Sequence, residues 1–392
     1  MWTRRQFVSR GVLGMLGLGG AYMALPAAGI GAGDKNADPE ALPDGSASAE
    51  LMERSDPAIA RGLAYLASHR NRDNSFGTGG YTGNVAVTSL AALAFMAGGS
   101  QPNRGPYGQI VADALRFVLK QDNRRGNHPG FLYNVDDGTA RCPMYSHGFG
   151  TLLLAETSGM VQDPALSEEV NRKLHEAVQL ILKCQNSAGG WRYNPEAIDA
   201  DISVTICMIM ALRAARNAGV VVPKSTVDRC VQYVMDCQDH RFGYFHYQKE
   251  GGGGSDSEAF ARTAAGVVAL CSAGYYLQTD VSQIKDPVEH ERAENAVRGI
   301  KLGLDFMQRN PPVGGPRLRD IHYFYGHYYA TQAMWAAGGE YWKRWYPFIR
   351  DELIGLQASD GSWFDGFCYH YSTAMACIVL QVPNNYLPIL QR

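Results

Sequence analysis

The stretch SVTICMIMALRAA (residues 203–215) decides the fold, because it is apolar on every side and five other stretches of the chain resemble it. Each of the six carries a threonine followed by small and apolar residues, with alanine and glycine common among them. A helix that is hydrophobic all round has to be buried all round. The sequence therefore predicts six buried helices, one around each of Thr88, Thr151, Thr205, Thr263, Thr331 and Thr373.

A different kind of helix is expected ahead of each buried one. In residues 168–181, the side chains of Val170, Leu174 and Val178 form one apolar stripe, while charged residues occupy the rest of the surface. That is the 3.6-residue period of a helix half exposed to water. Similar patterns occur at residues 59–67, 110–119, 227–237, 297–307 and 348–356. Outer amphipathic helices that alternate with inner apolar ones predict an all-α chain, an α/α toroid of six helical hairpins in two concentric layers (an α6/α6 barrel).

The connection between outer and inner helix also repeats. It is QNSAGGW at residues 185–191 and QASDGSW at residues 357–363, with a degraded copy at residues 238–244 in which Phe242 is expected at the glycine position. Glycine permits the turn, and the aromatic side chain can cover the end of the outer helix. This pattern resembles the repeat signature of squalene cyclases and protein prenyltransferase β subunits, which has a glutamine, a glycine four residues later and a tryptophan six residues later. The resemblance spans residues 56–385 and implies a toroid that these residues brace.

The chain length favours one ring, which resembles the prenyltransferase β subunit in size, whereas squalene cyclases carry two such helical domains. We therefore expect a single toroid domain over residues 56–392, preceded by a polar, proline-bearing linker over residues 34–55.

The first 33 residues carry the pair Arg4 and Arg5, then an apolar, glycine-rich run and small residues. This order is typical of an export signal, and the arginine pair resembles a twin-arginine signal. The prediction is a periplasmic or extracellular protein; a membrane anchor, which would keep the chain close to a membrane, is the alternative.

Charge and cysteine usage exclude other classes. The formal net charge is −2 and no basic stripe is present, which argues against a nucleic-acid partner. Eight cysteines form no CxxC pair or zinc-finger spacing and mostly fall inside helical patterns, so we expect core packing in a monomer without disulfides.

Polar residues recur four positions before the shared threonines. Because residues four apart lie on one helix face, we expect these positions to line a central cavity. On that hypothesis the catalytic residues are Asp201, His147, His327 and Tyr369, and Asn84 contacts the substrate. The alternative is that these residues are helix caps or satisfied core groups.

Asp201 is the most specific of them. It lies in DADIS (residues 199–203), which resembles the DxDD acid motif of class II terpene cyclases, with Ile202 in place of a further aspartate. The form in oxidosqualene cyclases, one aspartate followed by Cys-Thr, is closer. The resemblance implies that Asp201 donates a proton to an alkene, which requires a carboxyl held protonated by burial. The alternative is that Asp201 caps its helix.

Protein prenyltransferases bind zinc through Asp-x-Cys and a later histidine. The resemblance implies that Asp320, His322 and His370 bind the metal here, with histidine replacing cysteine. The alternative places His322 in a surface loop and His370 in a hydrogen bond to a tyrosine.

An aromatic wall is expected over the last two repeats, in HYFYGHYY (residues 322–329) and at residues 369–371. From it we expect Tyr325, Tyr328 and Tyr371 to contact the substrate. Aromatic faces suit isoprenoid chains and carbocations, and they suit sugar rings or plain packing equally well.

Three functions remain open from the sequence. The resemblance favours a terpene cyclase or prenyltransferase-like enzyme acting on an isoprenoid or other apolar substrate. The alternatives are a carbohydrate-active toroid related to polysaccharide lyases, with a glycan in the cavity, and a toroid that binds a ligand or partner without catalysis. A fold of this kind hosts several chemistries.

Overall fold

The computed structural model describes residues 53–121, 128–134, 142–251, 258–312, 322–366 and 368–391, which belong to one compact unit. The predicted leader and nearly all of the predicted linker lie outside these residues, so both stay predictions, as do the bounds of the toroid domain. Within the described residues no helix is both long enough and apolar enough to span a bilayer.

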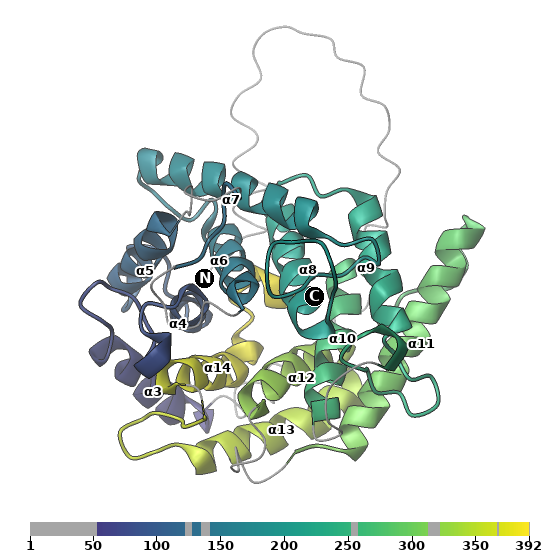
Figure 1. The fold of residues 1–392 in the computed structure, drawn as a ribbon. Coiled ribbons are helices and arrows are strands. Elements are labelled where there is room, and N and C mark those ends of the chain that lie inside the picture. The colour runs from purple at the N-terminus through teal and green to yellow at the C-terminus, as the bar shows by residue number, and fades with distance from the viewer. Residues whose placement is uncertain are drawn as a thin grey trace, which may run out of the picture. The chain divides into compact units, whose positions relative to one another are not determined.

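Six inner helices form a closed ring (Figure 1). Each packs against the next along the chain, and the last packs against the first. Each contains one of the six shared threonines, as predicted from their all-round apolar character. They are α4 (Val85–Ala97), α6 (Pro143–Thr157), α8 (Ile202–Asn217), α10 (Ala259–Ala273), α12 (Tyr323–Ala337) and α14 (Tyr369–Gln381).

The outer helices surround the ring (Figure 1). They are α3 (Asp56–Ser68), α5 (Gly108–Lys120), α7 (Pro164–Cys184), α9 (Lys224–Asp236), α11 (Pro287–Arg309) and α13 (Gly339–Leu356). Helix α3 packs mainly on α14, so the first outer helix also closes the ring. The predicted α/α toroid is confirmed.

Short 3-10 turns lie in three connections between the helices and in the segment after α14. They are η3 (Gly79–Tyr81), η4 (Lys249–Gly251), η6 (Val281–Gln283), η7 (Val382–Asn384) and η8 (Pro388–Leu390).

The tryptophan that ends each full copy of the loop motif joins three elements. The backbone N–H of Trp191 donates to the Thr205 hydroxyl at 3.1 Å, and its ring N–H donates to the Ile181 carbonyl at 2.8 Å. Ile181 belongs to the last turn of α7, where helix carbonyls have no partner within the helix. Trp363 repeats the ring contact on Leu353 of α13. The aromatic therefore covers the end of the outer helix, as predicted, and the shared threonine receives the loop.

The glutamine and the glycine of the motif fasten each loop to the next outer helix. Gln185 donates to the Thr226 carbonyl in α9 at 2.9 Å. Gly189 has a φ of 101°, and a Cβ there would lie 2.2 Å from the carbonyl oxygen of Arg229. A side chain is excluded both by this backbone conformation and by the close approach. Residues 357–363 meet α3 in the same way, which joins the last repeat to the first.

The degraded third copy is one residue longer than predicted. Phe242 is 51% exposed and does not occupy the glycine position, so that expectation is wrong. Gly243 occupies it, because its φ is 88° and a Cβ would lie 2.5 Å from the Leu302 carbonyl. Phe245 takes the place of tryptophan, fully buried with its N–H donating to the Thr263 hydroxyl at 3.2 Å.

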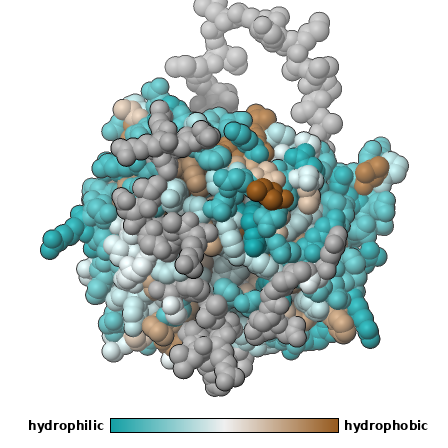
Figure 2. All heavy atoms as spheres, in the orientation of Figure 1, coloured by the Kyte–Doolittle hydropathy of each residue, from teal (hydrophilic) through white to brown (hydrophobic). Residues whose placement is uncertain are grey.

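Cysteines pack as small apolar residues. Seven of the eight are buried, and Cys142 is half-buried at the start of α6. This confirms the predicted core packing. On the face shown in Figure 2 the described atoms are mostly hydrophilic, with apolar residues scattered among them.

Candidate functional site

The shared threonines face the outer layer, which determines which residues face the centre. Their hydroxyls accept hydrogen bonds from the loops, for example from Trp191 to Thr205. A residue two positions before the threonine lies about 200° around the helix and therefore faces the ring centre. These inward positions are Ala86, Phe149, Ser203, Ala261, Tyr329 and Tyr371.

His147, predicted to be catalytic, is a brace between layers. Its ring is fully buried, Nδ1 accepts the Leu132 N–H at 3.2 Å, and Nε2 lies 3.2 Å from the Ala177 carbonyl in α7. Both ring nitrogens are thus used by backbone groups. Burial lowers the pKa of His147 to about 4, so the imidazole is neutral at pH 7.

His327 lies among aromatic rings. Its ring centroid is 4.4 Å from that of Tyr323, 5.4 Å from that of Phe260 and 5.6 Å from that of Trp345. The side chain is buried, and this burial lowers the pKa of His327 to about 3; the carbonyl of Pro312 weakly opposes the shift. The structure places His327 in the core between α12 and α13, away from the inward positions.

Asn84 and Tyr369 are also placed away from the centre. Asn84 caps α4, where its Oδ1 accepts the Val87 N–H at 3.0 Å. Tyr369 is 41% exposed at the start of α14 and packs against the ring of Phe364 at 5.3 Å. The position of Asn84 matches the alternative of a helix cap, whereas Tyr369 lies at the surface.

The histidines predicted to bind zinc contact different protein groups. Nδ1 of His370 accepts the Gly77 N–H at 2.9 Å, and its buried ring packs against Phe76. Nε2 of His322 lies 3.5 Å from the Glu258 carboxylate. Asp320 lies outside the described residues, and among the described ones no three histidine, cysteine or acidic side chains gather as a metal site would require.

Asp201 is the buried carboxyl that the sequence singled out. It is the N-cap of α8, fully buried, and its Oδ1 accepts the N–H groups of Ser203 and Val204 at 2.8 and 2.9 Å. Burial raises the pKa of Asp201 above its usual range, and these hydrogen bonds oppose the increase. Asp201 is therefore both a helix cap and a carboxyl with increased proton affinity.

Arg192 contacts the other oxygen of Asp201. A β-bridge between Trp191 and Asp201 sets the register, and Nη1 of Arg192 then lies 2.7 Å from Oδ2 of Asp201. Its Nε lies 3.2 Å from Asp199, and its guanidinium is 4.2 Å from the ring centroid of Tyr193. Burial disfavours the charge on Arg192, but the Asp201 carboxylate outweighs it and the pKa of Arg192 is raised.

Tyrosines surround this ion pair on the side of the ring centre. Tyr145 on α6 places its hydroxyl 2.6 Å from the Ser203 hydroxyl, which itself donates to Asp201. From α12, the Tyr325 hydroxyl donates to the Ser203 carbonyl at 3.3 Å. We call the half-buried side chains at this end of the ring the tyrosine cluster; they are Tyr145, Tyr193, Tyr247, Tyr325 and Tyr371.

Deeper in the ring, side chains of α12 cross the centre. The Tyr329 hydroxyl lies 3.4 Å from the Cys207 sulfur on α8, and the ring of Tyr328 lies 6.4 Å from that of Phe149 on α6. Tyr325, Tyr328 and Tyr329 together therefore fill much of the space between α6, α8 and α12.

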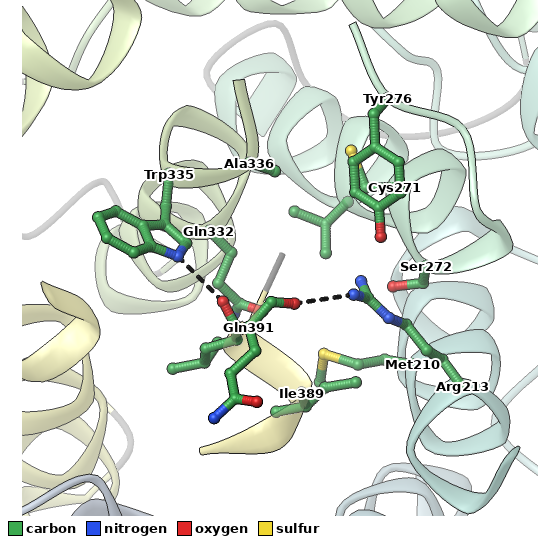
Figure 3. A pocket seen from close by; sticks show the side chains of 12 residues that line it. Met210, Arg213, Cys271, Ser272, Tyr276, Gln332, Trp335, Ala336, Ile389 and Gln391 are labelled. Atoms are coloured by element: carbon green, nitrogen blue, oxygen red, sulfur yellow. Dashed lines mark hydrogen bonds between the residues drawn. The ribbon is translucent and has the colours of Figure 1, made fainter. Parts of the chain in front are cut away.

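A small cavity lies at the opposite end of the ring, among the C-terminal halves of α8, α10 and α12 (Figure 3). The segment around η8 covers it. Arg213 donates to the Gln391 carbonyl at 3.2 Å and the Trp335 ring N–H donates to the Leu390 carbonyl at 3.0 Å. Tyr276 and Met210 complete the wall. The C-terminal segment thus covers this end of the ring, whereas Asp201 lies at the other.

The arrangement of helices is similar to that of several solved structures, among them three variants of one type II terpene cyclase. One is a variant of the type II terpene cyclase MstE from Scytonema bound to its substrate, geranylgeranyl dihydroxybenzoate, at a TM-score of 0.53 and 14% identity over 87% of this chain and 99% of that one. This chain has the type II terpene cyclase fold. A second MstE variant, bound to its product merosterolic acid A, gives a TM-score of 0.54 at 14% identity, over 86% and 99% of the two chains.

A third MstE variant, without ligand, gives a TM-score of 0.53 at 15% identity, over 87% and 99% of the two chains. No family model matches the sequence, and no curated protein matches it.

Sequence reasoning identified Asp201 and missed its neighbours. Ser203 could have been predicted from the position of the shared threonine, because it lies two residues before Thr205 and therefore faces inward. Arg192 directly follows the tryptophan of the loop motif, but its pairing with Asp201 depends on the β-bridge, which no local pattern indicates. Tyr145 likewise reaches Ser203 only because α6 and α8 are neighbours in the ring.

Proposed function

We propose that the chain is a terpene cyclase-like enzyme in which Asp201 protonates a carbon–carbon double bond of an isoprenoid held at the tyrosine cluster. The observation that carries this proposal is the full burial of the Asp201 carboxyl at the N-terminal end of the inner helix α8, with its proton affinity raised by burial. A general acid needs a pKa near the working pH, and burial is the usual means of raising it for a carboxyl.

The tyrosine cluster supports an apolar, polyunsaturated substrate. Aromatic faces attract the positive charge that protonation of an alkene creates, and they offer few nucleophilic atoms that could react with the carbocation. Burial raises the pKa of Tyr145 and of Tyr325, so their hydroxyls stay neutral beside a carbocation. The geranylgeranyl substrate of the structurally similar MstE is of the same chemical class.

The experiment is incubation of the purified protein with isoprenoids of increasing length, followed by gas chromatography and mass spectrometry. We expect a cyclised product from wild type and none from Asp201→Asn, which keeps the capping oxygen and removes the acidic proton. Phe242→Ala, at an exposed loop position outside the tyrosine cluster, is the control and should retain activity. Equal turnover by wild type and Asp201→Asn would refute the proposal.

A toroid that binds an apolar ligand without converting it is the second candidate. It is favoured by the side chains of Tyr328 and Tyr329, which cross the ring centre and leave little room for folding a long chain. On this hypothesis an isoprenoid would raise the melting temperature of the wild type and of Asp201→Asn alike, with no product formed.

We also propose export, on the basis of the arginine pair Arg4 and Arg5 and the apolar run that follows them. The partner of the mature protein is then a small apolar ligand outside the cytoplasm. Zinc binding by Asp320, His322 and His370 stays a prediction, and no step of this proposal uses it.

A further inference from the structure

Arg192 contacts two carboxylates of different exposure. Asp201 is fully buried and Asp199 is 54% exposed, while the Arg192 side chain between them is 23% exposed. Its Nη1 bonds to Asp201 and its Nε to Asp199, so the two contacts use different parts of one guanidinium. One guanidinium therefore bridges a buried carboxylate and an exposed one.

Few other charges act on Asp201. The titratable side chains that face it from the packed elements are tyrosines and cysteines, and burial raises the pKa of each, so that all are neutral near pH 7. They are Tyr145 on α6, Tyr193 and Tyr247 in the loops, Cys207 on α8, Tyr233 and Cys237 on α9, and Tyr325 on α12. Besides burial and the hydrogen bonds from Ser203 and Val204, the charge of Arg192 acts on the pKa of Asp201, and Arg192 also contacts Asp199.

We propose that Arg192 and Asp199 are positioning residues that control the proton of Asp201, with Arg192 acting as a latch that releases Asp201 and keeps its contact with Asp199 when the acid is to be loaded. This inference rests on the proposed function of Asp201 for its purpose, although its geometry does not depend on that function. In the closed arrangement described above, Arg192 favours the anionic form of Asp201 and opposes the increase in its pKa that burial causes.

The proton balance is simple. When Arg192 releases Asp201, a solvent proton binds Oδ2 of Asp201, the oxygen that Arg192 has left. That proton then forms the new C–H bond as the π bond of the alkene opens, and a carbocation results. Loss of a proton from the carbocation to water completes the reaction. Asp201 is again a carboxylate, and Arg192 returns to it.

The test is infrared titration of the protonated Asp201 carboxyl in the purified full chain, isolated by subtracting the spectrum of Asp201→Asn. Arg192→Gln removes the cation and should raise the midpoint by about 1–3 pH units, the usual effect of a neighbouring arginine on a carboxyl. Asp199→Asn removes a negative charge like that of Asp201 and leaves Asp201 as the carboxylate that Arg192 contacts, so the midpoint of the Asp201 titration should fall. Asp199 is exposed, so this variant should fold even if Arg192→Gln does not.

The two shifts of opposite sign distinguish a latch from a brace. A merely structural Arg192 would lower stability without a downward shift in Asp199→Asn. Arg192→Lys keeps the charge and should restore a midpoint near that of wild type. Arg292→Gln, which disrupts the separate ion network of Arg292 with Asp228, is the control and should leave the midpoint unchanged.

An unchanged or raised midpoint in Asp199→Asn would overturn the latch. Opposite shifts without any cyclised product would keep the latch and refute the proposed enzyme activity, so the two failures are distinguishable.

Discussion

Replacing Trp363 by alanine tests how the ring is closed. Trp363 is fully buried, its ring N–H binds the Leu353 carbonyl of α13 at 2.8 Å, and its backbone N–H binds Thr373 at 3.1 Å. Its ring also packs closely on Gly62 of α3, because a Cβ on that glycine would lie only 2.7 Å from the ring. One side chain thus joins the last repeat to the first.

The expected cost has two parts. Loss of a buried tryptophan with the resulting cavity costs about 3–5 kcal/mol. Trp363→Phe keeps most of the packing and loses the ring N–H, which leaves the Leu353 carbonyl without its partner and costs about 1–3 kcal/mol. The alanine variant should therefore be the less stable of the two, with both below wild type.

Equilibrium denaturation followed by circular dichroism at a helix wavelength measures both costs without relying on tryptophan fluorescence. Phe364→Ala, at the next residue and 55% exposed, is the matched control and should stay within about 0.5 kcal/mol of wild type. A loss below about 1 kcal/mol in Trp363→Ala would refute the idea that this loop closes the ring.

Four further predictions concern other parts of the chain. His147→Gln should lower the free energy of unfolding by about 1–3 kcal/mol, because it disturbs the bonds to the backbone of Leu132 and Ala177; unchanged stability on denaturation would contradict the bracing role. Burial lowers the pKa of His147 to about 4 and that of His327 to about 3, so the unfolded chain binds more protons than the native one below about pH 6.5. The stability contributed by the neutral imidazoles should be complete above pH 6.5 and fall as the pH drops toward about 4, and a flat profile in a pH series of melts would contradict this. Thiol titration under denaturant should find all eight cysteines free; four bridges would overturn the core assignment. Export should fail when Arg4 and Arg5 are both replaced by lysine, and normal export in a fractionation assay would exclude the twin-arginine route.

The ring could be predicted from sequence because its cause is local and repeated. An inner helix such as α8 is apolar on every side, and an outer helix such as α7 has an apolar stripe; each property is visible in a single window of residues. The loop glycines were equally visible, since Gly189 is required by its own backbone conformation. The third copy of the loop motif shows the limit of this prediction. One extra residue before Gly243 changes the spacing of the motif, although the contacts that the motif makes stay the same.

The residues of the site were harder to predict because the shared threonine was taken to face the cavity. Its hydroxyl instead receives the loop, as Thr205 does from Trp191, and every residue four positions earlier shares that outward face. His147 therefore braces the layers. Asp201 is an exception because it caps the helix in an extended conformation, with a φ of −140°, and so departs from the helical register. Its partner Arg192 is brought to it by a β-bridge across the loop.

The measurement that tests the central claim most directly is turnover in heavy water. If Asp201 protonates the substrate from a proton that it takes from solvent, each product molecule formed in D2O should carry one deuterium at the carbon first protonated, as mass spectrometry would reveal. Asp201→Asn should form no labelled product. A cyclised product without deuterium, or labelled product from Asp201→Asn at the wild-type rate, would contradict the account.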